Sequence, residues 1–265
     1  MTTLILGGTG KTGRRVAQHV DQARIASRGT GFDLGDPSSW ALDGVTAVYL
    51  VEPDLQAEPR LPRFVAEAVA AGARRLVLLS APRAGEEGHP LYAAERAVRE
   101  SGVGWTILHP NWFAQNFSEG PWRTSVLDGT LALPTGDGRT PFIDADDIAE
   151  VAVAALTEDR HSEQVYALTG PEATSFAEAI DLIAKATGRQ IQYVDLAPDV
   201  FTQRQLDFSA SPGAARLLTH ILVSIANGDA EARTDHVERV LGRPPRSFED
   251  YVAKAAAAGD WDADR

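Results

Sequence analysis

The sequence contains no cysteine and only one methionine among its 265 residues. The absence of cysteine excludes disulfide bonds, thiolate metal sites and cysteine nucleophiles. No window reaches about 18 uncharged apolar residues, so we expect no transmembrane helix and no membrane partner. The N-terminus begins with a strand-like apolar run and lacks the basic, apolar and cleavage regions of a signal peptide. We therefore expect a cytoplasmic protein.

Basic residues are also scarce, with 25 Lys and Arg against 37 Asp and Glu and a formal net charge of −12. Binding to nucleic acid needs a basic footprint, so we expect no nucleic-acid partner. The six histidines are scattered and form no H-x-x-x-H or H-E-x-x-H pair, so we expect no metal site. A hydrophobic share of 44% and a charged share of 23% are ordinary for a globular protein.

The first half of the chain alternates short apolar runs with helical patterns. Continuous β-branched and leucine-rich runs separated by helices are typical of a parallel sheet that is covered on both faces. Consecutive strands of this kind are joined by right-handed crossovers. The patterns predict strands at 3–6, 23–27, 47–51, 75–79 and 104–108, and helices at 13–20, 60–71 and 91–101.

The second half is less regular and mostly helical. Its patterns predict helices at 144–156, 175–187, 213–227 and 247–258, a helical trend from residue 198 onward, and strands at 164–168 and 190–196. The predicted fold class is α/β, a Rossmann-type doubly wound parallel sheet with a smaller, mostly helical C-terminal lobe. We predict a main domain over 1–150, and a part over 151–265 that mixes with the sheet and forms the lobe.

Glycines recur at every third position in the segment Gly7-Gly8-Thr9-Gly10-Lys11-Thr12-Gly13, directly after the first predicted strand. Without Cβ atoms, such a turn lets backbone N–H groups approach a pyrophosphate, and the following helix presents its positive end to the same anion. The position between strand and helix favours a dinucleotide-binding turn over a plain glycine-rich turn. A triphosphate-binding loop does not fit, because Ile5 stands where its first glycine is required.

The residues after the second predicted strand indicate which dinucleotide is bound. An acidic residue there binds the ribose 2′-hydroxyl of NAD, whereas arginine favours the 2′-phosphate of NADP. The sequence has Ser27-Arg28-Gly29, so Arg28 predicts that NADP(H) is preferred over NAD(H). The alternative is that Arg28 is an ordinary solvated side chain. We expect Asp33, a few residues later, to accept a hydrogen bond from the adenine amino group.

Two longer stretches carry a family resemblance. Residues 106–117 read TILHPNWFAQNF, and residues 142–149 read FIDADDIA. Together with the glycine turn, they resemble the NmrA-like group of atypical short-chain dehydrogenases/reductases over roughly residues 3–255. The branch that they resemble most contains the ergot-alkaloid reductases of the festuclavine and agroclavine dehydrogenase type, which reduce a cyclic iminium with NADPH. The resemblance implies that residues 1–150 are an NAD(P)-binding Rossmann domain and that the lobe binds substrate.

The resemblance also assigns roles by position. It implies that cofactor contacts come from Gly7, Thr9, Gly10, Lys11, Thr12, Gly13, Arg28, Asp33, Leu34, Val51, Pro53, Ser80, Pro110 and Asn111. We expect the substrate pocket to include Glu52, Ala81, His89, Trp112, Phe113, Trp122 and Phe142. For the aromatic members, ordinary core packing is the alternative interpretation. The segment between Arg28 and Asp33 is short for the group, so the sequence does not decide whether this loop binds the adenosine.

Carbonyl-reducing members of the superfamily use a tyrosine and a lysine four residues apart on one helix face, with the tyrosine as the acid. Tyr92 and Arg96 have this spacing, but arginine does not share a proton as lysine does. If Glu95 is aligned with the helix glutamate of the group, both catalytic positions are missing. His109 stands where the group has arginine, either as a packed residue or as a functional one. The candidate catalytic residues are therefore Tyr92 and His109.

These observations predict an NADPH-dependent reductase that delivers hydride to a C=N (iminium) bond or a C=C or quinone bond of a small, specialised metabolite. Reduction of an iminium needs no proton donor, which agrees with the missing pair. Two alternatives stay open, namely a non-catalytic NADP(H) sensor and a redox-neutral cyclase or isomerase on the same fold. The partner we expect is a small-molecule substrate, and the chain is a monomer or a homodimer.

Overall fold

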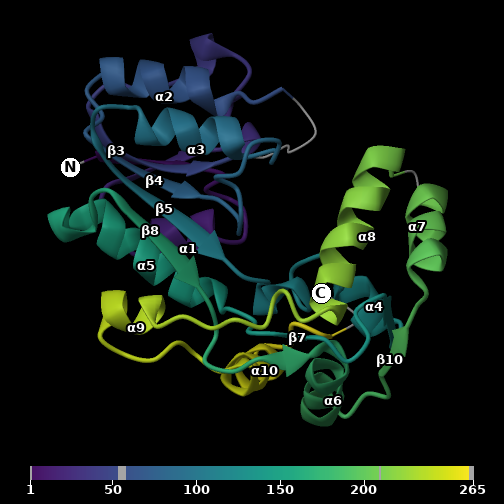
Figure 1. Ribbon diagram of the computed structural model, residues 1–265. Helices are drawn as coiled ribbons and strands as arrows, with labels where there is room; N and C mark the ends of the chain where they lie inside the picture. The colour runs from purple at the N-terminus through teal and green to yellow at the C-terminus, as the bar shows by residue number, and fades with distance from the viewer. Residues whose placement is uncertain (1, 53–57, 209, 263–265) are drawn as a thin grey trace. The chain divides into compact units, whose positions relative to one another are not determined.

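The computed structural model describes residues 2–52, 58–208 and 210–262 (Figure 1). Its main sheet has six parallel strands in the order β2-β1-β3-β4-β5-β8. These strands are β1 (Thr2–Leu6), β2 (Ala23–Ala26), β3 (Val45–Val51), β4 (Arg75–Leu79), β5 (Gly104–Pro110) and β8 (Gln164–Leu168). The predicted doubly wound, Rossmann-type sheet is confirmed.

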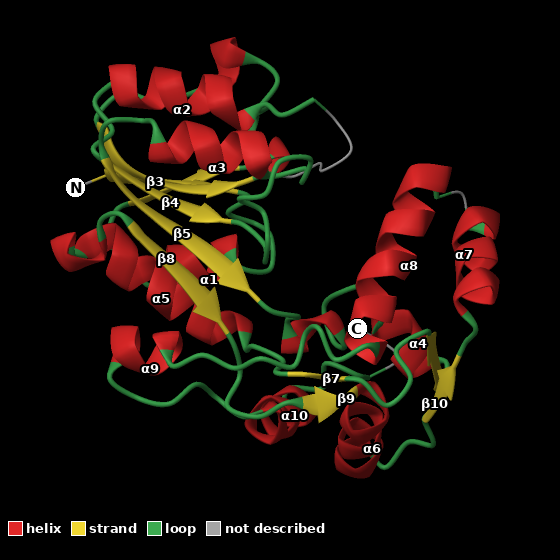
Figure 2. Cartoon of the chain, in the orientation of Figure 1, coloured by secondary structure: helices red, strands yellow, loops and turns green. Residues whose placement is uncertain are grey.

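Helices cover both faces of this sheet (Figure 2). On one face lie α2 (Leu61–Ala70) and α3 (Tyr92–Arg99), and on the other lie α1 (Gly13–Gln18) and α5 (Ala145–Thr157). Because each central strand is covered on both sides, its side chains are buried without alternation. Ile5, Val48 and Tyr49 are all fully buried, which is why the sequence of these strands is continuously apolar.

The chain divides into two compact units. Unit 1 contains residues 1–110, 145–168 and 235–244, and unit 2 contains 111–144, 169–234 and 245–265. The single boundary predicted at residue 150 does not coincide with this division. The chain passes between the units several times, and no composition shift marks those passages.

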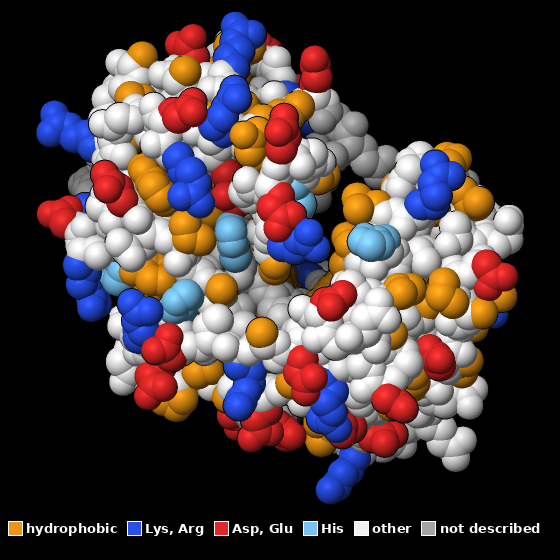
Figure 3. Space-filling model, viewed as in Figure 1, with side chains coloured by type: hydrophobic (Ala, Val, Ile, Leu, Met, Phe, Trp, Pro, Cys, Tyr) orange, Lys and Arg blue, Asp and Glu red, His pale blue; other side chains and the backbone are white. Residues whose placement is uncertain are grey.

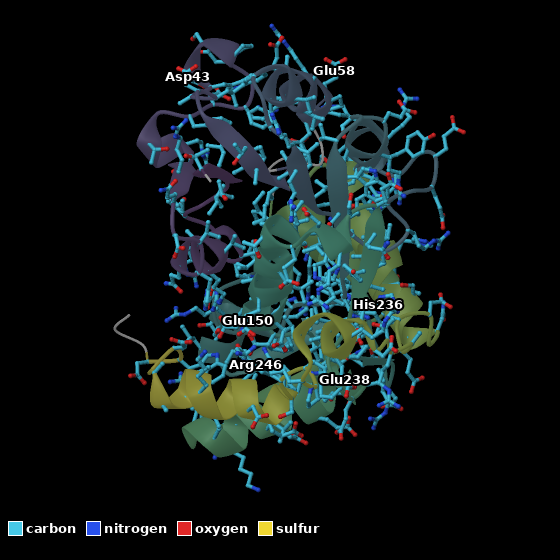
Figure 4. All side chains as sticks on the ribbon, turned by 90° about the vertical axis from the view of Figure 1, so that its left-hand side faces the viewer. Asp43, Glu58, Glu150, His236, Glu238 and Arg246 are labelled. Atoms are coloured by element: carbon cyan, nitrogen blue, oxygen red, sulfur yellow. The ribbon has the colours of Figure 1, made fainter. Side chains whose placement is uncertain are left out.

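The last segment of unit 1 is the short helix α9 (His236–Leu241), which packs against α5. His236 accepts a hydrogen bond at Nδ1 from the backbone N–H of Ala167 in β8, at 2.9 Å. Arg243, just after the helix, donates to Asp147 and Glu150 of α5. Figure 4 labels Glu150 of α5 and His236 of α9. These contacts explain how a segment near residue 240 joins a unit whose other residues all precede residue 169.

Unit 2 is mostly helical, with a few short strands. Its helices are α4 (Arg123–Leu127), α6 (Phe176–Thr187), α7 (Pro198–Asp207), α8 (Pro212–Ala226) and α10 (Phe248–Ala257). β6 (Thr130–Leu133) pairs with β10 (Gln192–Asp195), and β7 (Arg139–Thr140) pairs with β9 (Thr174–Ser175). The core is aromatic, with Phe117, Trp122, Phe142, Phe176 and Phe248 in mutual contact.

Most predicted elements are confirmed to within two or three residues, and the differences have local causes. The second strand ends at Ala26, one residue early, because Ser27 caps the 3₁₀ helix Arg28–Thr30. The sequence patterns miss β6, β7 and β9, since strands of two to four residues carry almost no periodicity and exist only through distant partners. α6 begins as predicted, because Ser175 and Glu178 form a reciprocal capping box.

None of the helices in the described ranges is long and apolar enough to span a bilayer. On the face drawn in Figure 3, acidic and basic side chains are interspersed, and no basic stripe stands out.

Candidate functional site

The glycine turn follows β1 and closes tightly on itself. Gly7 has a left-handed backbone, with φ of +63°. The N–H of Gly7 donates to Ala26 at the end of β2 at 2.9 Å, and the N–H of Gly10 donates back to the carbonyl of Gly7 at 2.8 Å. A Cβ atom on Gly13 would lie 2.3 Å from the same carbonyl oxygen. The turn therefore has its shape only with glycine at this position.

The turn lies at the switch point of the sheet. From β1, the chain goes first to β2 on one side and later to β3 on the other. Open α/β sheets bind ligands beyond the carboxyl ends of the strands at such a switch point. A Cβ on Gly7 would be 3.9 Å from that of Val51, the last residue of β3. A glycine-walled cradle here fits the pyrophosphate of a dinucleotide.

The residues expected around the adenosine lie in the segment after β2. Arg28 is exposed in the short 3₁₀ helix, and its guanidinium is open to solvent. The carboxylate of Asp33 accepts from the N–H of Gly35 at 2.8 Å, and it lies 4.0 Å from Nη1 of Arg60. Leu34 is buried in the core of unit 1, so its side chain supports this loop from below. Pro53, also predicted here, lies outside the described residues.

Arg60 is a residue that the sequence patterns did not single out. Its Nε is buried and has no hydrogen-bond partner among the described residues, while its other end faces Asp33. Glu52, predicted in the substrate pocket, is 8% exposed and accepts from the backbone N–H groups of Arg60 and Leu61 at 3.3 Å each. Glu52 therefore caps the start of α2.

A buried polar network lies at the carboxyl ends of β4 and β5. Glu95 of α3 is fully buried, and its Oε1 accepts from the hydroxyl of Ser80 at 2.6 Å and lies 2.6 Å from Nε2 of His109. Ser80 follows β4, and its N–H donates to Leu108 of β5 at 2.8 Å. His109 follows Ile107 by two residues, so it lies on the sheet face that α3 covers.

The charges of this network stabilise each other. Burial alone raises the pKa of Glu95, but the hydrogen bonds from His109 and Ser80, together with the charges of His109 and Arg99, bring it below the ordinary value. Arg99 lies one helical turn beyond Glu95, with Nη2 at 3.4 Å from Oε2. His89 lies in the loop before α3, and burial lowers its pKa despite the neighbouring Glu95. Glu95 is therefore held as a carboxylate.

Tyr92 and Arg96 do not form a catalytic pair in this structure. The Arg96 side chain is 62% exposed, and its Nε lies 3.9 Å from the carboxylate of Glu100. The Tyr92 hydroxyl has no hydrogen-bond partner in the part of the chain that the structure describes. The interpretation in which the tyrosine–lysine pair is absent agrees with this geometry.

The predicted pocket residues of unit 2 differ in burial. Trp122 and Phe142 are only 6% and 2% exposed and belong to the aromatic core. Their burial agrees with the alternative interpretation of ordinary core packing. Trp112 and Phe113 are half-buried, and Phe113 pairs with Ile143 through a backbone bridge. Asn111 accepts from the Thr140 hydroxyl at 2.8 Å and donates to Ala230 at 3.2 Å, so its side chain ties together three segments of unit 2.

The structure thus brings two groups of predicted residues together in unit 1. The glycine turn lies beside Val51, and Ser80 lies beside His109 through Glu95. In the sequence, Glu95 only aligns the helix around residues 91–101 with the corresponding helix of the family. The signal that would have found it is a carboxylate on the apolar face of α3, between Leu91, Ala94 and Val98.

Residues 33–251 match the NmrA-like family. The chain belongs to this family. The family resemblance read from the motifs is therefore confirmed. The matched range begins after the glycine turn and Arg28, so the family match does not include these residues.

Two relatives and one solved structure are similar to this chain over almost its whole length. The chain is 37% identical to the uncharacterized oxidoreductase YesF of Bacillus subtilis, over 96% of this chain and 95% of that one. It is 33% identical to festuclavine dehydrogenase of Aspergillus fumigatus, over 97% and 98%. The fold matches an NADPH-dependent quinone oxidoreductase of Escherichia coli in complex with NADPH, with a TM-score of 0.78, 22% identity, and 96% and 99% of the two chains covered.

Proposed function

We propose that this protein is an NADPH-dependent reductase that delivers hydride to a C=N bond, or to a C=C or quinone bond, of a small molecule. The observation that carries the proposal is the glycine cradle at the switch point, where Gly13 would collide with Gly7 if it had a Cβ. The assignment to oxidoreductases is supported by relatives of similar length named oxidoreductase and dehydrogenase. Festuclavine dehydrogenase and the quinone oxidoreductase support the two acceptor classes.

When bound, the nicotinamide cofactor supplies the hydride. The chain's own residues bind and orient it. Backbone N–H groups of the turn would face the pyrophosphate with no Cβ at Gly10 to hold it away, and the missing Cβ at Gly13 lets the turn close on Gly7. The guanidinium of Arg28 would contact the 2′-phosphate, because its planar fork matches phosphate oxygens and it is exposed beside the cradle. We extend this proposal to the remaining predicted cofactor contacts, Thr9, Lys11, Thr12, Val51, Ser80 and Pro110.

The acceptor side of the proposal rests on charge and aromatic side chains. A net charge of −12 attracts a cationic iminium more than an anion. Trp112 and Phe113, the half-buried aromatic members of the predicted pocket, would offer ring faces for cation–π contact with such an acceptor. Trp122 and Phe142 would act behind them, as core residues that fix this segment.

Calorimetric titration with NADPH and NADH tests the cofactor assignment. We expect tighter binding of NADPH, and Arg28→Ala should weaken NADPH about tenfold or more while leaving NADH nearly unchanged. Arg63→Ala, an exposed arginine on α2, is the matched control and should change neither affinity. Equal loss for both cofactors in Arg28→Ala would contradict the 2′-phosphate role.

A screen of acceptors follows, with oxidation of NADPH measured at 340 nm on a cyclic iminium and on a quinone. Turnover of either acceptor supports the reductase. NADPH binding without turnover of any acceptor would favour the sensor alternative, and conversion of a substrate without reductant would favour the redox-neutral alternative.

A further inference from the structure

The buried carboxylate of Glu95 is shared by two hydrogen-bonding side chains, one just after β4 and one in β5. Its exposure is zero, and both the Ser80 hydroxyl and the His109 ring meet the same oxygen, Oε1. A buried charge is retained only where it is paired and hydrogen-bonded. The proposed dinucleotide contacts include Ser80 but neither the Glu95 carboxylate nor the His109 ring, so the pairing of these two calls for a separate explanation.

The carboxylate fixes which nitrogen of His109 carries the permanent proton. Because Glu95 is an acceptor, Nε2 carries the hydrogen and donates it at 2.6 Å. Nδ1 then has no partner among the described residues, and the side chain retains 16% exposure. An imidazole oriented by a carboxylate on one side and open on the other is the arrangement by which proteins position a proton donor or acceptor.

We propose that His109 donates a proton from Nδ1 to the acceptor, with Glu95 and Ser80 as positioning residues. This rests on the reductase proposed above and concerns its C=C and quinone acceptors. Such neutral conjugated carbonyl compounds, enones and quinones, need one hydride and one proton for each two-electron reduction. An iminium cation, by contrast, takes hydride alone and becomes a neutral amine.

In an enone, the β-carbon gains the hydride that NADPH gives up in becoming NADP⁺, and the electron pair of the C=C bond moves toward the carbonyl oxygen. That oxygen forms an O–H bond as the Nδ1–H bond of protonated His109 breaks. His109 is left as the neutral imidazole with its Nε2–H still on Glu95, and it takes up a new proton from water. The enol becomes the saturated ketone in solution.

Other charged groups lie around the same histidine. On α3, Glu95 is the anion, and Arg99 pairs with its other oxygen. In the loop before α3, His89 interacts with both Glu95 and His109, and Glu86 and Arg83 interact with His89 in turn. Burial lowers the pKa of His89, so near neutral pH it adds little positive charge beside His109.

The hydroxyl of Ser80 has a distinct part in the network. It donates to the same carboxylate oxygen that accepts from His109, so it helps to hold that oxygen in place. Its backbone N–H bond to Leu108 fixes it beside the strand that carries His109. Ser80→Ala should therefore weaken the orientation of the ring and leave the charge of Glu95 in place.

The test compares two acceptors in the same variants, with 1,4-naphthoquinone as the neutral acceptor and an N-methyl-3,4-dihydroisoquinolinium salt as the cationic one. General acid catalysis contributes about 10²–10⁴-fold. We expect His109→Gln and Glu95→Gln to lose on the order of 10²-fold in kcat for the quinone. Both should stay within about threefold of wild type for the iminium, since that reaction needs no proton. Glu100→Gln, on the exposed side of the same helix, is the control and should change neither.

The contrast between the two acceptors separates a proton donor from a structural role, because a merely structural loss would slow both reactions. An equal loss for the two acceptors, or an unchanged quinone rate in His109→Gln, would overturn the proposal.

A spectroscopic measurement makes the inference independent of turnover. The ¹⁵N chemical shifts of the neutral His109 ring should show the proton on Nε2 in wild type and a mixture of both tautomers in Glu95→Gln. A proton on Nδ1 in wild type would overturn the proposal even if the protein proves to be a reductase. NADPH affinity, measured by calorimetry in the same variants, should be unchanged, so a failed cofactor assignment is distinguished from a failed proton donor.

Discussion

A Cβ atom on Gly13 would lie 2.3 Å from the carbonyl oxygen of Gly7 and 2.7 Å from its carbonyl carbon. Both atoms belong to the backbone, so the turn has to open to admit any side chain. The glycine at the start of α1 is therefore a condition for the cradle. It also explains why the turn stays narrow next to β3.

Gly13→Ala tests this relationship. We expect a loss of roughly 1–3 kcal/mol in the free energy of unfolding, because the backbone of a packed turn has to shift. NADPH affinity should fall at least tenfold, since the N–H groups lose their alignment. Urea unfolding and calorimetry measure the two effects. Gly213→Ala, in helix α8, is the control, because a Cβ there meets nothing within 4 Å. It should leave NADPH affinity unchanged and should not lower the free energy of unfolding. Unchanged NADPH binding in Gly13→Ala would contradict the cradle.

Tyr92→Phe tests whether Tyr92, which has the four-residue spacing to Arg96, is the acid. The Tyr92 hydroxyl has no hydrogen-bond partner in the described part of the chain, and Arg96 pairs with Glu100. We expect kcat to change less than about threefold with either class of acceptor. Steady-state kinetics at constant NADPH gives the answer. A loss of about a hundredfold with the fold intact would make Tyr92 the proton donor in place of His109.

Phe142→Ala tests the packing of unit 2. Phe142 is 2% exposed and contacts Phe117, Phe176 and Phe248, so truncation leaves a cavity among rigid rings. We expect a loss of about 3–5 kcal/mol in the free energy of unfolding. Phe208→Ala is the matched control, because Phe208 is 84% exposed, and it should cost less than about 0.5 kcal/mol. If the two variants unfold at the same urea concentration, the core assignment of Phe142 is wrong.

His161 predicts how stability depends on pH. It is 3% exposed, its Nδ1 lies 2.8 Å from the Tyr166 hydroxyl, and burial lowers its pKa from 6.5. Below about pH 6.5 the unfolded chain therefore binds a proton that the folded protein does not. This contribution to stability is complete above pH 6.5 and is lost as the pH falls toward the folded-state pKa.

The free energy of unfolding of wild type should accordingly fall by up to about 1.4 kcal/mol per pH unit more steeply than that of His161→Gln in this range. Urea unfolding of both proteins at pH 7.5, 6.5 and 5.5 gives the difference. The difference in free energy of unfolding between wild type and His161→Gln should shrink as the pH falls, because glutamine does not titrate. A constant difference across the three pH values would show that His161 has the same affinity for protons in both states.

The sheet and the cradle could be predicted because their causes are local. A strand buried on both faces must be apolar throughout, and the runs around Ile5, Val48 and Val77 record this directly. A turn that closes on its own backbone must have glycine, and Gly13 records that. The capping of α6 by Ser175 and Glu178 is equally local, since both partners lie within four residues.

Glu95, Ser80 and His109 could not be brought together from the sequence, because they come from a helix, the end of β4 and a strand, up to 29 residues apart. Nor could the burial of Trp122 and Phe142 be distinguished from a pocket, since an aromatic residue has the same sequence signature in both places. By itself the sequence determined the parallel sheet, the glycine turn and the family, all of which depend on residue type at short spacing. Only the tertiary structure decided which polar groups share a carboxylate, since strand order and helix placement set those distances.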